Sequence, residues 1–455
     1  MNSYTDIKMP ISRREVLSRG LTWAGALAGS AMLPAWAQAL TRPASAPATA
    51  PSPGKARSVI QIWLGGGPCH LDTWDPKPDA GRDYFGQFDK PIPTNVPGIQ
   101  ICQMLPLLAK QADKYSIIRS MTHGVNGHET AAYYVQTGRK PGQGLVFPAV
   151  GAVVSYFKGY DAGYKGLIPP YIVLTELQGR FSEVGFLPLR YKPFATGGNP
   201  AQPRFVVEGV VAEGVSEQRQ RDRRELLAKT NALAGALPGD EQLASAQQAR
   251  EQAYDLILGD AGKVFDLAQE KDDMRERYGR NTFGQSCLMA RRLVEKGVPY
   301  VTINHGGWDT HKDHFPAMRR MLPEMDKAMS ALLSDLSERG LLESTIVWWS
   351  GEFGRTPKVQ WEAPWNGGRG HYGAVFSAVV AGGGFQGGRV VGASDAKGEK
   401  VASRPVWPAD LIESMYQLLG IDPGATLPGP GGRAIRVTPT PAESGSTDGP
   451  LKELM

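Results

Sequence analysis

The sequence predicts an α/β sandwich built around a mostly parallel sheet. Short apolar runs of strand length alternate along the chain with longer stretches of helical periodicity. This alternation is typical of parallel sheets, in which helices connect successive strands. Residues 58–437 lie between two segments rich in Pro, Ala and Ser, and a stretch of that length holds one large domain or two smaller ones. The chain has no internal repeat.

Six apolar runs are the expected strands. Their shortness and their content of Val, Ile, Leu and aromatic residues fit strands that are buried on both faces. The first run is followed by Gly65, Gly66 and Gly67, which predict a tight loop. The six runs are residues 58–64, 115–119, 171–174, 298–303, 344–349 and 375–380.

The clearest expected helix covers residues 315–339. Pro323 either kinks this helix or marks its start, and Gly340 ends it. Residues 215–296 are expected to be mostly helical, and residues 408–419 form a closing helix. In the long helix, apolar residues recur at helical spacing; they are Met318, Met321, Leu322, Met325, Met329, Leu332, Leu333 and Leu336.

The first 37 residues have the features of an export signal. The segment Ser12-Arg13-Arg14-Glu15-Val16-Leu17 precedes an apolar, small-residue run at residues 20–36, and residues 35–37 (AWA) match an A-x-A cleavage pattern. The paired arginines make this a twin-arginine signal, with Val16 where an aromatic residue is usual. The alternative is an uncleaved membrane anchor, but the run is short for a span, which needs about 20 strongly apolar residues. We therefore expect a periplasmic or secreted protein.

Beyond the signal peptide (1–37), we expect a Pro/Ala/Ser-rich linker (38–57), one folded domain (58–437) and a polar tail (438–455). The net charge is +5, of which residues 1–37 contribute +2, so the rest of the chain carries +3. With no Lys/Arg stripe, this balance gives no case for a nucleic-acid partner. Three cysteines argue against a disulfide framework, although one bridge is compatible with them. No second apolar stretch is long enough to span a membrane.

Histidines and acidic residues gather just after the predicted strands. In a parallel sheet the carboxyl ends of the strands share one edge, where ligands bind. His371 reaches that edge only if its Gly-rich loop folds back over it. The residues that follow strand ends are His70, Asp72, His123, His128, His305, Asp309, His311 and Glu352.

This set has the donors of a metal site. Mixed histidine and carboxylate ligands suit zinc, manganese or iron, and the set can hold one or two ions. Two ions can clamp both oxygens in phosphoryl-type transfer. Arg355 and Arg369 suit bidentate binding of a phosphate or sulfate oxyanion. The candidate ligands are Asp72, Asp309, His311, Glu352, His371, His70 and His305.

Each of these positions also has a structural interpretation. Asp72 is placed to cap a turn, and Glu352 to pair with Arg355. A single loop histidine is more often a hydrogen-bonding or surface residue than a ligand. On that view His123 orders its loop, and His314 is a solvated residue at a helix start.

Six sequence motifs follow one another along the chain. They are residues 65–78 (GGGPCHLDTWDPKP), 278–280 (YGR), 290–298 (ARRLVEKGV), 307–311 (GWDTH), 351–357 (GEFGRTP) and 381–384 (AGGG). These motifs resemble the bacterial domain-of-unknown-function family 1501, and the resemblance covers about residues 58–437.

That family is similar to a branch of the alkaline phosphatase and sulfatase superfamily. The resemblance implies a three-layer α/β/α sandwich with a metal site after successive strands. Carried over by position, Asp72 is the first-strand carboxylate, Asp309 and His311 are the mid-chain pair, Glu352 stands near the superfamily's Asp-His position, and His371 is its late histidine.

The sequence departs from the family pattern in two places. Gly370 stands where an Asp usually precedes the late histidine, so one ligand is missing. Cys69 stands where a Ser is common, and it lacks the Cys-x-Pro-Ser-Arg signature, which argues against a formylglycine sulfatase.

The superfamily's nucleophile is a Ser, Thr or modified Cys at a helix start after the second strand. Thr130 is the best match and Thr122 the second, although a helix cap explains either threonine. With Thr130, His128 and Arg355 complete the catalytic candidates.

The leading hypothesis is an exported, metal-dependent hydrolase of phosphate or sulfate esters, acting on a small-molecule or polysaccharide ester. The competing hypothesis is a non-catalytic envelope binding or assembly protein that keeps the fold, and Gly370 and the lack of a clear nucleophile favour it. A third class is a carbohydrate-active protein that uses Trp361 and Trp365.

Overall fold

An eight-stranded sheet with the strand order β12-β4-β11-β8-β1-β7-β5-β6 organises the molecule. All neighbouring strands are parallel except β11, which is antiparallel to both β4 and β8. The predicted mostly parallel sheet is therefore confirmed. Its strands are β1 (Ser58–Trp63), β4 (Tyr115–Met121), β5 (Tyr171–Leu174), β6 (Phe194–Ala195), β7 (Tyr300–Asn304), β8 (Thr345–Ser350), β11 (Phe376–Ala381) and β12 (Val390–Val391).

The computed structural model describes residues 54–202 and 260–455, apart from residues 143, 178, 180–182 and 445, and a few isolated residues between 203 and 259. These residues belong to one unit, which spans Ala46–Met455. The predicted signal peptide, most of the linker and the first half of the helical stretch at 215–296 lie outside the described residues.

All six predicted strands are present, each within two residues of its expected bounds. The helices are α3 (Arg82–Phe85), α4 (Pro106–Ala109), α5 (His128–Thr137), α6 (Val150–Lys158), α9 (Asp260–Lys263), α10 (Asp272–Tyr278), α11 (Thr282–Glu295), α12 (His314–Glu338), α13 (Pro408–Leu418) and α14 (Pro441–Ser444). Short hairpins pair β2 (Ile92–Pro93) with β3 (Gln100–Ile101), β9 (Gly354–Arg355) with β10 (His371–Tyr372), β13 (Ala393–Ser394) with β14 (Val401–Ser403), and β15 (Thr426–Pro428) with β16 (Ala434–Arg436).

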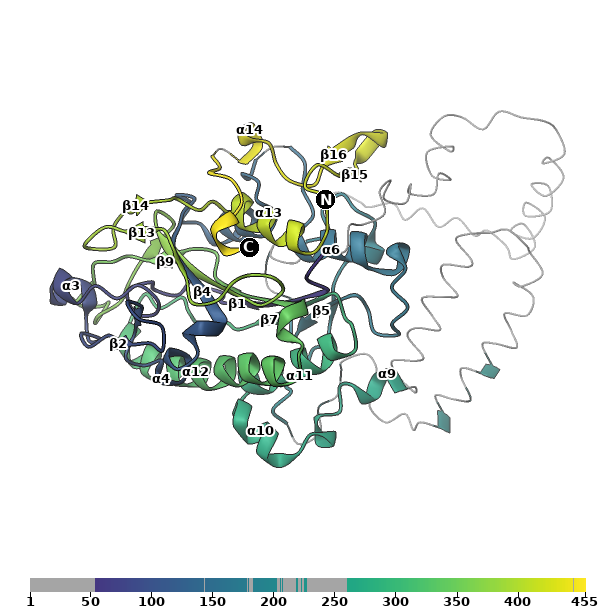
Figure 1. Ribbon diagram of the computed structural model, residues 1–455, viewed down its shortest axis with the longest axis horizontal. Helices are drawn as coiled ribbons and strands as arrows, with labels where there is room; N and C mark the ends of the chain where they lie inside the picture. Colours follow the sequence, from purple (N-terminus) through teal and green to yellow (C-terminus); the bar gives the residue numbers. More distant parts are fainter. Residues whose placement is uncertain are drawn as a thin grey trace, which may run out of the picture. The chain divides into compact units, whose positions relative to one another are not determined.

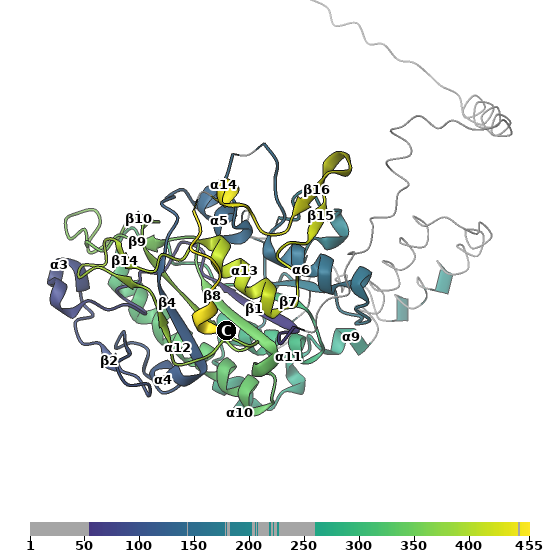
Figure 2. The same cartoon turned by 45° about the horizontal axis from the view of Figure 1, so that its top comes forward.

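The sheet separates two apolar cores, and side chains of β1 alternate between them. Ile60 and Ile62 enter the core beneath α11 and α12, whereas Val59 and Trp63 enter the core beneath α5, α6 and α13. Figure 1 shows α11 and α12 on one side of the sheet and α6 and α13 on the other, and Figure 2 shows α5 beside α6 and α13. The structure is thus the expected three-layer α/β/α sandwich.

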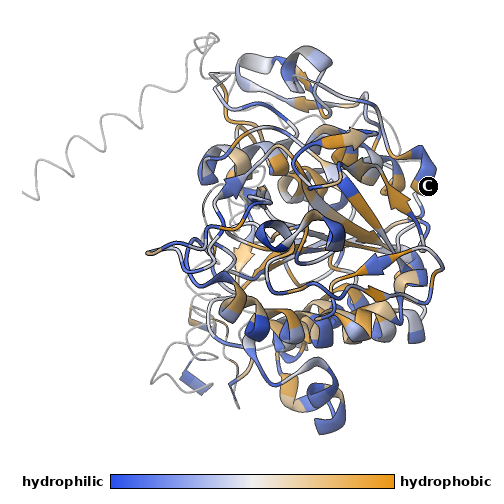
Figure 3. Cartoon of the chain, turned by 90° about the vertical axis from the view of Figure 1, so that its left-hand side faces the viewer, coloured by the Kyte–Doolittle hydropathy of each residue, from blue (hydrophilic) through white to orange (hydrophobic). Residues whose placement is uncertain are grey.

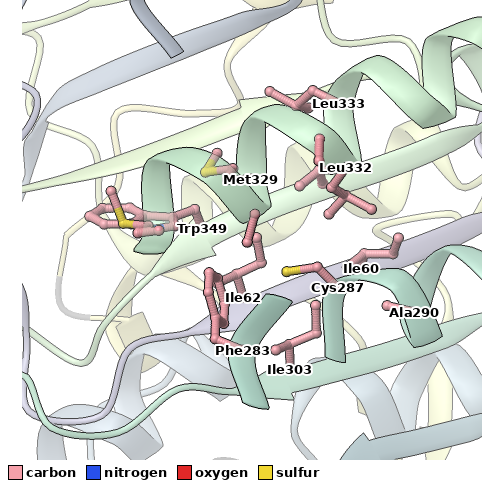
Figure 4. Close-up of a cluster of buried hydrophobic side chains, with 14 of the residues drawn as sticks. Ile60, Ile62, Phe283, Cys287, Ala290, Ile303, Met329, Leu332, Leu333 and Trp349 are labelled. Carbon is pink, nitrogen blue, oxygen red and sulfur yellow. The ribbon is translucent and has the colours of Figure 1, made fainter. Parts of the chain in front are cut away.

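Helix α12 shows how the sequence pattern produces this packing. Every apolar residue of its predicted stripe is buried. Figure 4 shows Met329, Leu332 and Leu333 of this helix facing Cys287 and the strands of the sheet. Burying each such side chain contributes roughly 1.5–3 kcal/mol to folding. Pro323 lies inside α12, so it does not mark the start of the helix.

The direction of β11 decides what meets at the carboxyl edge of the sheet. Because β11 is antiparallel to β4 and β8, its first residue lies at the edge where those strands end. His371 in β10 precedes β11 by a few residues, so it reaches this edge through strand direction as well as through its loop.

The last residues fold onto the domain. Residues 438–455, expected as a polar tail, place Leu451 and Leu454 in the core that contains α13. The Asp410 carboxylate of α13 accepts hydrogen bonds from the backbone of Asp448 and Gly449, at 3.2 and 3.1 Å. These contacts hold the C-terminal residues against α13.

Two further properties follow from the side chains. Cys69, Cys102 and Cys287 are free and buried, so none of them forms a disulfide. Among the described residues, no helix combines the length and the apolar character needed to cross a membrane.

Figure 3 shows the sheet strands largely in hydrophobic colours, while the helices carry both hydrophobic and hydrophilic residues.

Candidate metal centre

Side chains from four strand ends meet at the carboxyl edge of the sheet. His128 is the first residue of α5, which follows β4. Asp309 and His311 lie in the loop between β7 and α12, and Glu352 lies between β8 and β9. Together with Arg355 of β9 and His371 of β10, these residues form what we call the open cluster.

Asp309 is the hub of the open cluster. One carboxylate oxygen, Oδ1, lies 3.0 Å from His311 Nε2 and 3.1 Å from His371 Nε2, and it also accepts a hydrogen bond from Arg355. The other oxygen, Oδ2, lies 3.3 Å from His128 Nε2. Partial burial opposes ionisation, but the hydrogen bond and charge of Arg355 outweigh it and lower the pKa of Asp309 to about 2. The carboxylate is therefore ionised at neutral pH.

Glu352 holds His128 in place. Glu352 Oε1 lies 2.8 Å from His128 Nδ1 and accepts a hydrogen bond from the Gly66 backbone, also at 2.8 Å. The hydrogen bond to Glu352 raises the pKa of His128. His123 Nε2 lies 2.7 Å from the Glu352 carbonyl, so a second histidine fixes this backbone. Glu352 is 3% exposed, yet its Oε2 has no hydrogen-bond partner.

His371 is oriented from its other nitrogen. Its Nδ1 lies 2.8 Å from the Asn126 carbonyl oxygen, which can only accept, so Nδ1 carries the proton. Nε2 lies on the opposite side of the ring, 3.1 Å from Asp309 Oδ1 and 2.9 Å from His311 Nε2, so it faces the other donors of the cluster. Phe353 stacks on the ring with its centroid 4.5 Å away. In metal sites, a ligating histidine commonly donates its other ring N–H to a backbone carbonyl, which fixes the orientation of the ring.

The open cluster fits a divalent metal ion. His128, Asp309 and His371 each offer a ligand atom, and these atoms lie within 4.8 Å of one another. Ligands at about 2.0–2.2 Å from one ion lie at most about 4.4 Å apart, so the three atoms are close to the spacing that an ion needs. The unpartnered Oε2 of Glu352 is a further oxygen donor whose burial costs free energy unless something binds it. Two histidine nitrogens and carboxylate oxygens suit zinc or manganese.

Three predicted ligands lie elsewhere. Asp72 is fully buried, and Arg369 Nε and His314 Nε2 each lie 2.8 Å from its Oδ2. We call Asp72, His314 and Arg369 the closed cluster. His70 is buried with Nε2 2.9 Å from the Gly398 carbonyl, and His305 stacks on Phe283 with ring centroids 4.1 Å apart. These residues follow strand ends, as the sequence indicated, but their side-chain contacts lie outside the open cluster, and His70 Nδ1 and His305 Nε2 have no hydrogen-bond partner.

The two arginines, Arg355 and Arg369, are buried and bind other groups of the protein. Arg355 is fully buried and donates to the carbonyls of Gly66, Gly67 and Arg369 as well as to Asp309. It is placed to support Asp309 rather than to hold an oxyanion. Arg369 is also fully buried, so the alternative oxyanion site at this residue is closed. His314, expected at the surface, is 1% exposed.

The structure separates the two candidate nucleophiles from the open cluster. Thr130 is exposed, donates a hydrogen bond to the Gly127 carbonyl at 3.0 Å, and lines a pocket next to the cluster. Thr122 lines a third pocket, beside Trp407. The pocket of about 240 Å³ at the open cluster is instead lined by His128, Glu129, Asp309 and Glu352, with Trp63, Gly65, Gly66, Ala132 and Gly179. Burial raises the pKa of the Cys69 thiol, which keeps it protonated.

Sequence reasoning did not identify two supporting residues. Asn126 binds His371 through its backbone carbonyl, and its side-chain Oδ1 accepts a hydrogen bond from Gly373 at 2.7 Å. Gly66 supports Glu352 through its backbone N–H. Backbone contacts leave no side-chain signal, although Asn126-Gly127 is a recognisable turn dipeptide.

The fold and this cluster define an α/β protein with a metal-type donor set at the carboxyl edge of a parallel sheet. The chain belongs to the family described as "Protein of unknown function (DUF1501)", whose model matches residues 56–444. The family resemblance seen in the sequence motifs is therefore confirmed. A search of curated protein sequences gives no match.

Solved structures with a similar fold include members of the superfamily that the sequence resembles. The PsFucS1 sulfatase from Pseudoalteromonas sp. is 16% identical, with 80% of this chain and 68% of that chain covered and a TM-score of 0.36. A protein in the alkaline phosphatase superfamily from Vibrio parahaemolyticus is 8% identical, with 81% and 68% covered and a TM-score of 0.38. The C-terminal periplasmic domain of EcEptC from Escherichia coli, in complex with Zn, is 11% identical, with 88% and 97% covered and a TM-score of 0.35.

Proposed function

We propose that this protein is a metal-dependent hydrolase of phosphate or sulfate esters. The observation that supports this proposal best is the meeting of His128, Asp309 and His371, three donors from separate segments. His128 and Asp309 also line a pocket. An ion held there would polarise the ester and lower the pKa of a nearby water. Zinc or manganese, as one or two ions, suits these donors.

The residues around the donors have defined parts in this proposal. Arg355 keeps Asp309 ionised, and Glu352 orients His128 through Nδ1. The carbonyl of Asn126 orients His371. The pocket holds the ester group against the donors, and water attacks the phosphorus or sulfur atom while the alcohol leaves.

Metal content and activity of the purified protein test the proposal. Wild type is expected to bind a divalent ion and to hydrolyse at least one member of a panel of aryl phosphates, phosphodiesters and sulfates. Asp309→Asn should lose both properties. Asp272→Asn is the matched control, because its side chain is 90% exposed and pairs with Arg280, which follows α10. Absence of bound metal in wild type, or full activity of Asp309→Asn, would end the proposal.

One observation favours the alternative, a non-catalytic envelope protein. Among the described residues that line the pocket at the open cluster, none carries a hydroxyl or thiol that could attack an ester. The alternative predicts a protein that binds metal but turns over no ester in the panel. Direct attack by water, as proposed above, predicts turnover without a covalent intermediate.

We also propose that the protein is exported by the twin-arginine route and acts in the periplasm or outside the cell. Arg13 and Arg14, the apolar run at 20–36 and the A-x-A pattern at 35–37 support this proposal. A fusion of residues 1–57 to a reporter that is active only after export of a folded chain tests it. Replacing both arginines by lysine should retain the reporter in the cytoplasm.

A further inference from the structure

A second pocket lies beside the open cluster on the same helix. It has a volume of about 360 Å³, and Glu129 lines both it and the pocket of the open cluster. We call this second pocket the α5 groove; its main lining residues are Glu129, Thr130, Tyr133, Pro141, Leu145 and Val146. Because His128 and Ala132 line the first pocket and Glu129 and Tyr133 the groove, the two pockets occupy adjoining faces of α5.

The far wall of the groove is held to the helix. The Tyr133 hydroxyl accepts a hydrogen bond from the Phe147 backbone at 3.0 Å and donates to the Leu145 carbonyl at 3.4 Å. Arg139 lies over the Phe147 ring, with its guanidinium carbon 4.0 Å from the centroid. Residues 145–147 are thus held by Tyr133 of α5 and by Arg139, which follows the helix, and the groove has a defined shape.

The walls of the groove are mainly apolar. Pro141, Leu145 and the ring of Tyr133 are apolar, and Val146 is 43% exposed. The polar groups are Thr130 and Glu129. Thr130 donates its proton to the Gly127 carbonyl and keeps its oxygen lone pairs as acceptors. Such a surface suits a ring-sized apolar group that carries a hydrogen-bond donor.

We propose that the α5 groove binds the alcohol part of the ester, and that this alcohol is a ring-sized apolar group. The proposal rests on the proposed function, because only a substrate cleaved at the open cluster would place its leaving group in the adjoining groove. Among the described residues that line the groove, none is basic, which disfavours a polyanionic glycan as its occupant. A monoester with one charged group and an uncharged, apolar alcohol fits both pockets.

Binding of the free alcohol tests the groove without requiring catalysis. We would titrate the full-length protein with 2-naphthol and follow the naphthol fluorescence, first in wild type and then in Val146→Asp. The matched control is Val390→Asp, which makes the same substitution at a valine that is 37% exposed on β12, an edge strand. A charge placed on the apolar wall should weaken binding by about tenfold or more, which corresponds to about 1.4 kcal/mol. The control should bind as wild type does.

The outcomes separate the two proposals. If the protein hydrolyses no ester but Val146→Asp still weakens naphthol binding, the groove stands as an alcohol site and the proposed function fails. If esters are hydrolysed but wild type binds no naphthol, or Val146→Asp and Val390→Asp bind it equally, the groove proposal is overturned and the function stands. Thr130→Val, which removes the acceptor oxygen and keeps the side-chain shape, should weaken 2-naphthol binding more than binding of naphthalene.

Discussion

The molecule contains two clusters of the same chemical types that lie in opposite environments. The closed cluster combines Asp72, His314 and Arg369, all at most 1% exposed. The open cluster also combines an aspartate, histidines and an arginine, but the side chains of Asp309 and His128 are 44% and 42% exposed. The chain supplies both clusters from overlapping segments, since residues 309–314 and 355–371 contribute to each.

The difference lies in whether the polar atoms have partners inside the protein. In the closed cluster, His314 Nδ1 lies 2.6 Å from Thr310 Oγ1, and Arg369 also donates to the Tyr84 and Thr356 carbonyls. In the open cluster, His311 Nε2 and His371 Nε2 lie 2.9 Å apart beside the same Asp309 oxygen, and Glu352 Oε2 has no hydrogen-bond partner. A satisfied network stabilises a fold, whereas an unsatisfied one is a place for a ligand.

The largest effect should come from removing the hub of the open cluster. Asp309→Asn keeps an acceptor for Arg355 but loses the charge that attracts a metal. Ester hydrolysis is expected to fall by about 10³-fold or more, equivalent to about 4 kcal/mol. The free energy of unfolding of the metal-free protein should also fall, because buried Arg355 loses its counter-charge, but by less than in Asp72→Asn, since Asp309 is 44% exposed and Arg355 keeps three carbonyl acceptors. Kinetics and denaturant titration of one sample measure both quantities. A large loss of stability would remove the distinction between the clusters.

The corresponding substitution in the closed cluster, Asp72→Asn, should mainly lower the free energy of unfolding and should leave metal binding unchanged. Asp72→Asn leaves the buried Arg369 without its counter-charge, and breaking a buried ion pair costs about 3–5 kcal/mol. Denaturant unfolding measures the loss, and metal content per folded molecule should stay at the wild-type value. Loss of metal from folded Asp72→Asn would mean that Asp72 acts on the centre, as the family resemblance implies.

The acid sensitivity of folding should depend more on the closed cluster. Burial lowers the pKa of His314, so the folded state keeps it neutral where the unfolded chain, with a pKa near 6.5, takes up a proton. The stability from this group is present above that pH and is lost as the pH falls. His314→Gln, which keeps a donor for Asp72, should reduce the slope of unfolding free energy between pH 6.5 and 5 by up to about 1.4 kcal/mol per pH unit.

His311→Gln is the comparison for this measurement, made with chelator present. Burial also lowers the pKa of His311, but its side chain is 39% exposed and water stabilises its charged form. Its substitution should therefore change the slope less. An equal change in both variants would show that exposure does not separate the two clusters.

The sequence predicted the sheet, its strands and α12 because burial on both faces leaves a strong apolar signal. It also predicted that Asp309, His311, Glu352 and His128 would lie near one edge, since they follow strand ends, and that His371 would reach this edge if its loop folded back. It did not separate Asp72 from Asp309. Both follow a strand, and what distinguishes them is the burial of Arg369 and His314 from distant segments. The antiparallel β11, which brings His371 to the site, likewise depends on long-range pairing that a single sequence does not reveal.

The smallest effect should come from the ring that supports His371. Phe353 stacks on His371 at an interplanar angle of 27° and also lies 5.1 Å from the His128 ring. Aromatic pairs contribute about 0.5–1.5 kcal/mol beyond burial, so Phe353→Leu should weaken metal affinity by about two- to tenfold. Competition with a fluorescent chelator measures it. Phe88→Leu is the control, because Phe88 stacks edge-on with Phe315 near the closed cluster and should leave metal affinity unchanged. Equal affinities in wild type and Phe353→Leu would mean that hydrogen bonding alone orients the two histidines.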